Sequence, residues 1–379
     1  MVALDLSAAF DTVDHGILSS VLLNKFGISG KALEWVRSYL NNRQLKVKVN
    51  ESSSSLHTFN YSVPQGSCLG PVLFNVYAST ITDCIPDGLS MGGYADDHFI
   101  RGNYDPSNSE ETTSCITTIE TTLLKVRDWM SANRLKLNPS KTEVIIFGSQ
   151  QMLNKQSTQS INVAGDKINV GSCIKYLGAQ LDATLSFKDF ISQKCRAAVT
   201  SIRNIAQIRK FIDIKIAKQL ASALVLSHLD YSNSILCGLP ESSITPLQRV
   251  QNWAARVVLN QSRYDSAVLA LRELHWLPIH ERIDFKVACL VFKCINKQAP
   301  STLSSTLSNK SFARQTRAAS TAVRILEIPK TKKKTFASRS FSVYGPELWN
   351  SLPPSLRAVQ DFKSFKRDLK THLFKRAFY

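Results

Sequence analysis

The sequence has no apolar run that approaches the ~20 residues a helix needs to cross a bilayer. Its N-terminus also lacks the basic-then-apolar pattern of a secretory signal. We therefore expect no membrane partner and an intracellular protein, in the nucleus, the cytoplasm or both. Acidic residues are scarce, since 29 Asp and Glu stand against 47 Lys and Arg and the net charge is +18. That balance makes a polyanion such as nucleic acid the first partner to expect.

No Cys-x-x-Cys pair occurs among the eight cysteines, and 379 residues are far too many for a disulfide-stapled miniprotein. We expect reduced thiols in the core. The alternative is a zinc site formed by His275, His280, Cys289 and Cys294. Residues five apart on a helix lie ~140° apart around its axis, which splits each pair across two faces and disfavours that site.

Two adjacent carboxylates, Asp96 and Asp97, follow Tyr94 and precede an apolar stretch that begins at Phe99. Like charges side by side are costly in a folded interior unless a cation or hydrogen bonds compensate them. The pair therefore suggests a divalent metal site where two strands turn. Paired aspartates also occur in ordinary solvated turns, and these residues alone leave both interpretations open.

The first six residues form a buried strand pattern that Asp5 interrupts. A carboxylate at the end of such a strand needs a cation or a good set of hydrogen bonds to stay ionised. Helices are expected next over 14–25 and 30–40. Asp11 and Asp14 are interpreted as helix-start residues, because acidic side chains favour the first turn of a helix.

Further along, alternating residues predict paired strands over 44–49 and 56–63, joined by a turn at 51–55. The Pro64-Gln65-Gly66 turn leads into an apolar helix over 72–81. Gly66 permits a sugar or base to approach the backbone closely, although a tight strand-to-helix turn explains the pattern as well. A long amphipathic helix and several short strands follow, and together they predict an α+β fold with a mixed sheet and helices on one face. The helix covers 109–135, and the strands cover 142–147 and parts of 161–181.

After Phe187 the pattern becomes helical. Helices are predicted over 191–212, 216–229 and 245–259, with one or two more in 264–300. The first of them carries a basic stripe that includes Lys194, Arg196 and Arg203, and the two arginines are seven apart and hence on one face. Such a stripe is usually a solvated face, but beside a polymerase-like sheet it would contact a duplex backbone.

The end of the chain is strongly basic. A Ser/Thr/Asn-rich linker is expected from 300 to 311, and segment 311–379 holds 15 Lys and Arg but only 4 Asp and Glu. Its most basic stretch, from Lys330 to Lys334, could be a nuclear-import tract, an RNA contact or a solvated loop.

A strand-borne aspartate, a Pro-Gln-Gly turn and a Tyr-Ala-Asp-Asp hairpin follow each other in the order of a reverse transcriptase palm. Residues 5–11 (Asp-Leu-Ser-Ala-Ala-Phe-Asp) resemble the first palm motif, residues 63–71 the second and residues 94–97 the third. Residues 135–142 look like the fourth motif, and Tyr176, Leu177 and Gly178 resemble the primer-grip region. The sequence is most similar to the non-LTR retrotransposon branch of the family (LINE-type), particularly to vertebrate CR1/L2-like members.

The resemblance implies an RNA-directed DNA polymerase that uses two Mg²⁺ ions, with Mn²⁺ as an alternative. Its implied partners are an RNA template, a DNA primer and a deoxynucleoside triphosphate. By position, Asp5 and Asp96 would hold the metal with the carbonyl of Leu6, and Asp97 would be the third catalytic carboxylate. The residues implied in binding nucleotide or template are Phe10 at the sugar 2′ side, Pro64, Gln65 and Gly66 against the nucleotide and template, and Lys141 near the triphosphate.

The resemblance also implies a domain order. We expect a palm over 1–183 without its fingers, a helical thumb over 184–262, a helical connection and linker over 263–310, and a basic C-terminal tail region over 311–379. The fingers segment and the apurinic-type endonuclease of such elements are expected to be missing. Ser62 departs from the pattern, because a glycine often precedes the second motif. The alternatives are a catalytically inactive remnant that binds nucleic acid and an inert relic of an element.

Overall fold

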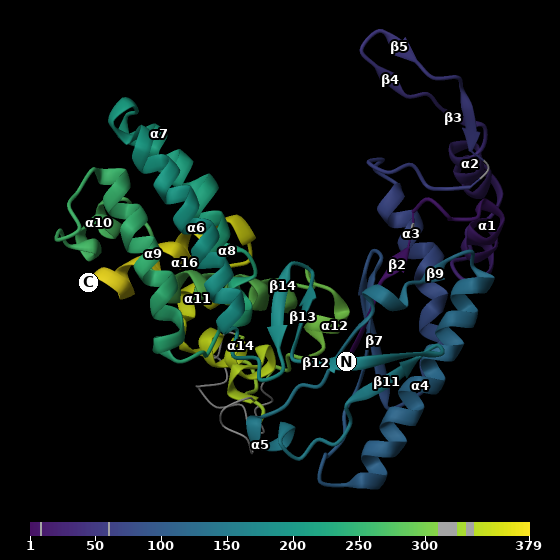
Figure 1. The fold of residues 1–379 in the computed structure, drawn as a ribbon. Helices are drawn as coiled ribbons and strands as arrows, with labels where there is room; N and C mark the ends of the chain where they lie inside the picture. Colours follow the sequence, from purple (N-terminus) through teal and green to yellow (C-terminus); the bar gives the residue numbers. More distant parts are fainter. Residues whose placement is uncertain (8–9, 60, 310–323, 331–336) are drawn as a thin grey trace. The chain divides into compact units, whose positions relative to one another are not determined.

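The computed structural model describes residues 1–7, 10–59, 61–309, 324–330 and 337–379. Contacts within the chain divide it into two compact units, Met1–Leu185 and Ser186–Tyr379 (Figure 1). The first unit combines a mixed sheet with helices and the second is helical, so the predicted α+β class is confirmed. Ala8 and Ala9 of the first motif lie outside the described residues, as do positions 331–334 of the most basic stretch.

The centre of the first unit is a six-stranded sheet. Strand β8 is the second strand of the hairpin that carries the paired aspartates. It pairs antiparallel with β1, and β1 pairs antiparallel with β10 on its other side. Because β12 runs parallel to β10, the sheet is mixed. In sheet order the strands are β11 (Ser160–Val163), β12 (Asp166–Gly171), β10 (Glu143–Ile145), β1 (Val2–Leu4), β8 (Asp97–Gly102) and β7 (Leu89–Tyr94).

Helices pack against this sheet and enclose an apolar core. The long helix α4 contacts β8, β9 and β11, and its buried residues include Leu123, Val126 and Met130 (Figure 1). Asp14 caps α1, since its carboxylate accepts from the backbone N–H groups of the first turn, which confirms its interpretation as a helix-start residue. The helices are α1 (His15–Asn24), α2 (Gly30–Leu40), α3 (Gly70–Ala78), η1 (Ser79–Cys84), α4 (Ser109–Ala132), η2 (Pro139–Lys141) and α5 (Gln150–Leu153).

A long β-hairpin projects from the end of α2 (Figure 1). Its base pairs β3 (Arg43–Leu45) with β6 (His57–Phe59), and its tip pairs β4 (Lys48–Val49) with β5 (Ser52–Ser53). The predicted turn at 51–55 is therefore wrong at Ser52 and Ser53. The chain reverses earlier because Asn50 adopts a left-handed φ of 54°, a conformation that asparagine tolerates. Two more short strand pairs join β2 (Leu6–Ser7) to β9 (Lys136–Leu137) and β13 (Cys173–Tyr176) to β14 (Ala179–Asp182).

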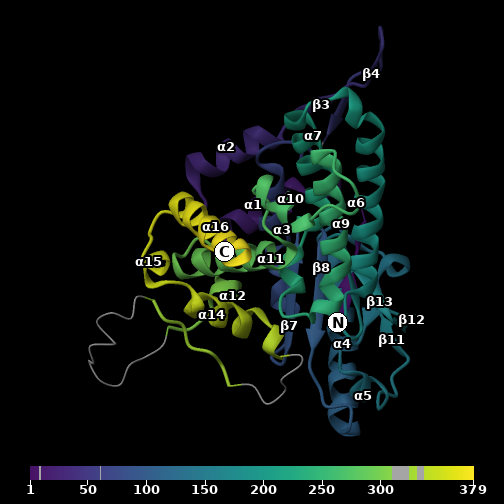
Figure 2. The same cartoon turned by 90° about the vertical axis from the view of Figure 1, so that its left-hand side faces the viewer.

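The second unit is built from helices. The predicted helix over 216–229 is confirmed, because α7, the π-helical turn η4 and α8 follow one another without a break from Ile214 to Asp230. Helix α11 packs against α14 and α16 (Figure 2), and the rings of Phe292 and Phe365 stack with their centroids 4.5 Å apart. The helical segments are α6 (Lys188–Ile208), η3 (Arg209–Phe211), α7 (Ile214–Ala221), η4 (Ser222–Leu226), α8 (Ser227–Asp230), η5 (Asn233–Leu236), α9 (Glu241–Leu259), α10 (Ala267–Glu273), α11 (Ile279–Ile295), α12 (Ser301–Ser304), η6 (Ala337–Arg339), α14 (Phe341–Ser351), α15 (Pro354–Arg357) and α16 (Phe362–Phe378).

Much of the predicted basic tail therefore shares a core with the helices that precede it. Trp349 of α14 and Phe365 of α16 are both fully buried. The division into palm, thumb, connection and tail stays a prediction.

All eight cysteines are free thiols. Cys237, Cys289 and Cys294 are buried as expected, but Cys68 is exposed, so the expectation of core thiols is wrong for that residue. Cys68 lies on the turn before α3, where the chain must reach the surface to reverse. In the part of the chain that the structure describes, no helix is both long enough and apolar enough to cross a membrane.

Candidate active site

The register of the central strands brings Asp5 to the paired aspartates. Strand β1 pairs with β8 so that Val2 lies opposite Ile100 and Leu4 lies opposite His98. Asp5 directly follows β1, and Asp97 is the first residue of β8. One further step of the same antiparallel register therefore sets the two aspartates opposite each other.

The β7–β8 turn presents Asp96 to solvent. Tyr94 and Asp97 form the last strand pair, and Ala95, with a left-handed φ of 55°, begins the two-residue turn. Asp96 is exposed, whereas Asp97 is half-buried. The turn is fixed from below by His98, whose Nδ1 lies 3.3 Å from the carbonyl oxygen of Asp96.

Two glycines make room for the aromatic rings under this turn. Gly92 and Gly93 of β7 lie opposite Phe99 and His98 of β8. A Cβ added at Gly93 would lie 2.5 Å from Cδ2 of His98, and one at Gly92 would lie 2.5 Å from Cζ of Phe99. The hairpin can hold both rings across the strands only because these positions carry no side chain.

The carboxylates of Asp5, Asp96 and Asp97 lie close enough to influence one another electrostatically. Burial raises the pKa of Asp97 above its ordinary value, and the charges of Asp96 and Asp5 raise that pKa further. Oδ2 of Asp5 is buried and has no hydrogen-bond partner in the described residues. The cation next to it is Lys141, whose Nζ lies 3.6 Å from Oδ2 of Asp5, beyond hydrogen-bond reach.

Lys141 reaches Asp5 because the fourth motif is hydrogen-bonded to the first. Strand β9 pairs Leu137 with Leu6, and the backbone N–H of Asn138 donates to the carbonyl of Asp5 over 3.1 Å. The η2 turn then carries Lys141 back toward the carboxylate. Leu6, the predicted carbonyl ligand, is buried in this strand pair.

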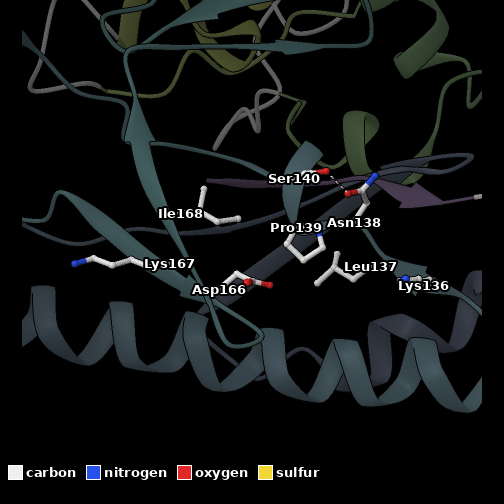
Figure 3. Close-up of a pocket in the computed structure, with 8 residues that line it drawn as sticks. All are labelled: Lys136, Leu137, Asn138, Pro139, Ser140, Asp166, Lys167 and Ile168. Atoms are coloured by element: carbon white, nitrogen blue, oxygen red, sulfur yellow. Dashed lines mark hydrogen bonds between the residues drawn. The ribbon is translucent and has the colours of Figure 1, made fainter.

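The same segment borders an open pocket of about 610 Å³ that the sequence did not predict. Figure 3 shows Ser140 beside Asn138, to whose Oδ1 it donates a 2.7 Å hydrogen bond. The three carboxylates do not line the pocket, so it is not the predicted metal site. Its lining residues are Lys136, Leu137, Asn138, Pro139, Ser140, Asp166, Lys167 and Ile168.

The second motif is also tied to the first. The amide of Gln65 donates to Oδ1 of Asp11 over 3.0 Å, and the backbone N–H of Val63 donates to the carbonyl of Phe10 over 2.9 Å. Gly66 has a φ of 77°, which favours glycine. The carbonyl of Pro64 accepts from the hydroxyl of Ser67, whose Oγ accepts from the backbone N–H of Gly70, the first residue of α3.

The ring of Phe10, predicted at the sugar 2′ side, stacks on Phe74 of α3 with the centroids 4.6 Å apart. Ser62, in the place of the frequent glycine, has a left-handed φ of 93°. A glycine would adopt that conformation without the strain that a Cβ brings, which explains the family preference in physical terms.

The predicted primer-grip tyrosine lies against the aspartate hairpin. The hydroxyl of Tyr176 donates to the carbonyl of Asp97 over 3.4 Å, and its ring meets Phe99 edge to face with the centroids 5.5 Å apart. Burial raises the pKa of this tyrosine, and so does the charge of Asp97. Leu177 and Gly178, both with positive φ, form the exposed turn between β13 and β14.

The three predicted basic contacts lie on α6 in the second unit. Arg196 and Arg203 are exposed. Nζ of Lys194 lies over the rings of Phe190 and Tyr231, at 5.1 and 4.2 Å from their centroids.

The donor chemistry at the carboxylates fits a divalent cation. Mg²⁺ prefers oxygen ligands, and it is usually held by one or two carboxylates together with substrate phosphates. Asp5 offers a buried oxygen that lacks a hydrogen bond, and Asp96 offers exposed ones. Among the residues described, no group of three or more His, Cys, Asp and Glu side chains is arranged to hold a metal, so protein side chains alone do not complete a coordination sphere. The same holds for His275, His280, Cys289 and Cys294, the residues of the zinc alternative, which form no such group.

Comparison with known proteins matches residues 1–181 to the family described as reverse transcriptase (RNA-dependent DNA polymerase). A probable RNA-directed DNA polymerase from transposon BS of Drosophila melanogaster is 26% identical over 293 residues, covering 74% of this chain and 31% of that protein. The RNA-directed DNA polymerase from mobile element jockey of the same species is 26% identical over 210 residues, which cover 54% of this chain and 22% of that protein.

A third relative, a probable RNA-directed DNA polymerase from the Drosophila melanogaster transposon X-element, is 24% identical over 267 residues and covers 67% of this chain and 28% of that protein. This chain therefore spans less than a third of the length of these relatives. Among solved structures, a telomerase from Candida albicans in complex with a telomeric RNA fragment has a TM-score of 0.31 at 13% identity, covering 75% of this chain and 48% of that one. A score this low supports no argument.

Proposed function

We propose, from the premise that residues 1–181 are a LINE-type member of the reverse transcriptase family, that this chain catalyses RNA-directed DNA synthesis. The reaction is nucleotidyl transfer from a deoxynucleoside triphosphate to the 3′-hydroxyl of a DNA primer on an RNA template. The observation that carries the proposal is the approach of Asp5 to the Asp96-Asp97 hairpin, where Asp5 keeps a buried oxygen without a hydrogen bond.

Asp5 and Asp96 would hold two divalent ions, Mg²⁺ or Mn²⁺, with the carbonyl of Leu6, and Asp97 would support them. When bound, such ions lower the pKa of the attacking hydroxyl and neutralise the charge of the leaving pyrophosphate. Lys141 lies 3.6 Å from Asp5 on an exposed turn, so it can stay by the carboxylate or turn to the triphosphate. Its contact with Asp5 supports a role at this end of the nucleotide.

The neighbouring motifs would position the nucleic acid. Gln65 and Gly66 are exposed beside Phe10, as a surface against nucleotide and template requires. Tyr176 couples the primer-grip turn to Asp97, so a primer held by Leu177 and Gly178 would stay in register with the carboxylates. The basic residues of α6, namely Lys194, Arg196 and Arg203, would contact the template–primer backbone. With these substrates the chain would act inside the cell, in the nucleus or the cytoplasm.

Primer extension on an RNA template in Mg²⁺ tests the proposal. We expect wild-type incorporation to fall by more than about a hundredfold in Asp96→Asn, because a metal ligand is lost. Asp87→Asn is the matched control, since Asp87 is an exposed aspartate of the same unit. Incorporation that survives Asp96→Asn, or a wild-type chain that incorporates nothing where an unrelated reverse transcriptase extends the same primer, would contradict the proposal.

The second candidate is a catalytically inactive remnant that binds nucleic acid. It is favoured by the net charge of +18, which suits the binding of RNA without a reaction. That function predicts RNA binding that weakens with salt, is unchanged in Asp5→Asn and is accompanied by no incorporation.

A further inference from the structure

Helix α2 presents one cationic and two aromatic side chains on one side, of which Lys31 and Trp35 are exposed and Tyr39 is half-buried. Lys31, Trp35 and Tyr39 are spaced four residues apart and therefore lie on one side of the helix. Leu33 and Leu40, on the opposite side, are buried and attach the helix to the first unit. Trp35 is 58% exposed, so its indole ring is not part of the core.

The planar groups on this face are already stacked in a row. The rings of Trp35 and Tyr39 lie 6.3 Å apart with an angle of 15° between their planes. The guanidinium carbon of Arg43 lies 4.4 Å from the centroid of the Tyr39 ring, and Nε of Arg43 donates to the carbonyl of Tyr39 over 2.7 Å. We call Lys31, Trp35, Tyr39 and Arg43 the α2 strip.

The charge around the strip is predominantly positive. Positions 31–48 hold five basic residues and one acidic residue, Glu34. Lys46 and Lys48 continue the basic surface onto the exposed hairpin that follows Arg43. A single exposed aromatic residue is ordinary on a protein surface. A stacked aromatic pair with a cation at each end is instead the combination that nucleic-acid-binding proteins use for bases and phosphates.

We propose that the α2 strip binds single-stranded nucleic acid. A base stacks on the outer face of Trp35, and Lys31 and Arg43 contact the flanking phosphates. The pre-formed stack on Tyr39 holds the indole in place, so little side-chain freedom is lost on binding. The inference rests on the proposed function only for the identity of the strand, which would be template RNA away from the carboxylates.

A protein partner is the competing occupant of this region. Leu45, Val47 and Val49 of the hairpin are 50, 56 and 64% exposed, and such apolar side chains suit a protein contact. They lie beyond Arg43, however, and the strip itself is cationic and aromatic. The observations therefore favour nucleic acid for the strip, and the experiment separates the two.

The test uses the full chain and a fluorescent single-stranded RNA oligonucleotide, with affinity measured by anisotropy at low and moderate salt. We expect Trp35→Ala to weaken binding about tenfold, because one stacked base is lost. Arg43→Ala should weaken binding and lessen its dependence on salt. Trp35→Phe should retain most of the affinity while it removes RNA-induced quenching of indole fluorescence. Phe26→Ala is the control, since Phe26 is 47% exposed in the same unit and lies off the strip.

The outcomes separate the strip from the catalytic proposal. RNA binding by Trp35→Ala that equals that of the wild type overturns the inference, whatever the extension assay shows. If Trp35→Ala instead abolishes self-association in sedimentation and leaves RNA affinity unchanged, the strip is a protein contact and the inference is also overturned. Weakened RNA binding in Trp35→Ala supports the inference even if the wild type extends no primer, and in that case only the proposed function fails.

Discussion

Asp284 of the second unit and Asp5 of the first unit differ in how their buried oxygens are paired. In the second unit Asp284 is 2% exposed, yet both its oxygens are engaged. The hydroxyl of Tyr344 donates to one over 2.6 Å, and the guanidinium of Arg376 donates to the other over 2.5 Å. In the first unit Asp5 keeps a buried oxygen with no hydrogen bond, opposite two further carboxylates.

This difference separates an acid that stabilises the fold from the acids that we propose bind a metal ion. The network at Asp284 joins α11 to α14 and α16, and burial beside that carboxylate raises the pKa of Tyr344 strongly. A buried charge whose partners are all in place favours the one structure that supplies those partners. Asp5 has only a 3.6 Å ion pair with the exposed Lys141 and keeps one oxygen without a hydrogen bond, as the proposed metal ligand requires.

The largest expected difference is in stability, when each of the two acids is replaced by alanine. We expect Asp284→Ala to lower the free energy of unfolding of the second unit by about 3–5 kcal/mol, because Arg376 and Tyr344 lose their partner. Asp5→Ala should change the stability of the first unit by less than about 0.5 kcal/mol. Chemical denaturation with a fluorescence readout measures both. Equal losses in the two variants would show that the acids have the same role.

A smaller loss of stability is expected from a substitution under the aspartate turn. Gly93→Ala places a Cβ only 2.5 Å from Cδ2 of His98. This clash should lower the free energy of unfolding by about 1–3 kcal/mol and reduce nucleotide incorporation. The double variant Gly93→Ala with His98→Ala should be more stable than the sum of the single losses predicts, since the clash is gone. Strictly additive losses would contradict the packing explanation.

At Ser62 we expect a substitution to increase stability. The φ of 93° strains a residue with a Cβ, so Ser62→Gly should raise the free energy of unfolding by about 0.5–1 kcal/mol after the added freedom of the unfolded chain is counted. Thermal unfolding of the two proteins side by side measures it. A lower stability of the glycine variant would mean that the serine side chain makes a contact that outweighs the strain.

The smallest expected effect is the pH dependence at Asp97. The folded chain holds a proton on this carboxyl more strongly than the unfolded chain, because its pKa is raised above 3.8. Stability should therefore fall as pH rises from below 3.8 through the raised folded-state pKa. Above that window Asp97→Asn should be the more stable protein, and below it the two should converge. The difference is small because water screens this half-buried group, and an equal pH profile of both proteins would show that the pKa of Asp97 is not raised in the folded chain.

The resemblance to the palm motifs implied that Asp5 and the Asp96-Asp97 pair lie close together. In the structure Asp5 lies opposite Asp97, one step beyond the last pair of the β1–β8 register. The ion pair of Lys141 with Asp5 could not be predicted, since it depends on the β2–β9 pairing that carries the η2 turn back. The contact of Tyr176 with Asp97 likewise needs the fold, because it joins two hairpins through a side chain and a carbonyl.

Composition says little about packing in the C-terminal segment. Its many lysines and arginines predicted a basic tail region, and within that region Phe365, Leu369 and Leu373 of α16 repeat every four residues and are buried. Their spacing was the signal that could have predicted a packed helix. At Ser52 and Ser53 the serine run suggested a turn, whereas the left-handed Asn50 decides where the hairpin reverses.

The contrast between the two acids is tested most directly by measuring folded fraction and nucleotide incorporation together, in Mg²⁺, for the wild type, Asp96→Asn and Asp284→Asn. The account predicts that Asp96→Asn is as folded as the wild type and incorporates no nucleotide. It also predicts that Asp284→Asn loses activity only in proportion to its loss of folded protein. Incorporation by a folded Asp96→Asn chain at the wild-type rate would contradict the account.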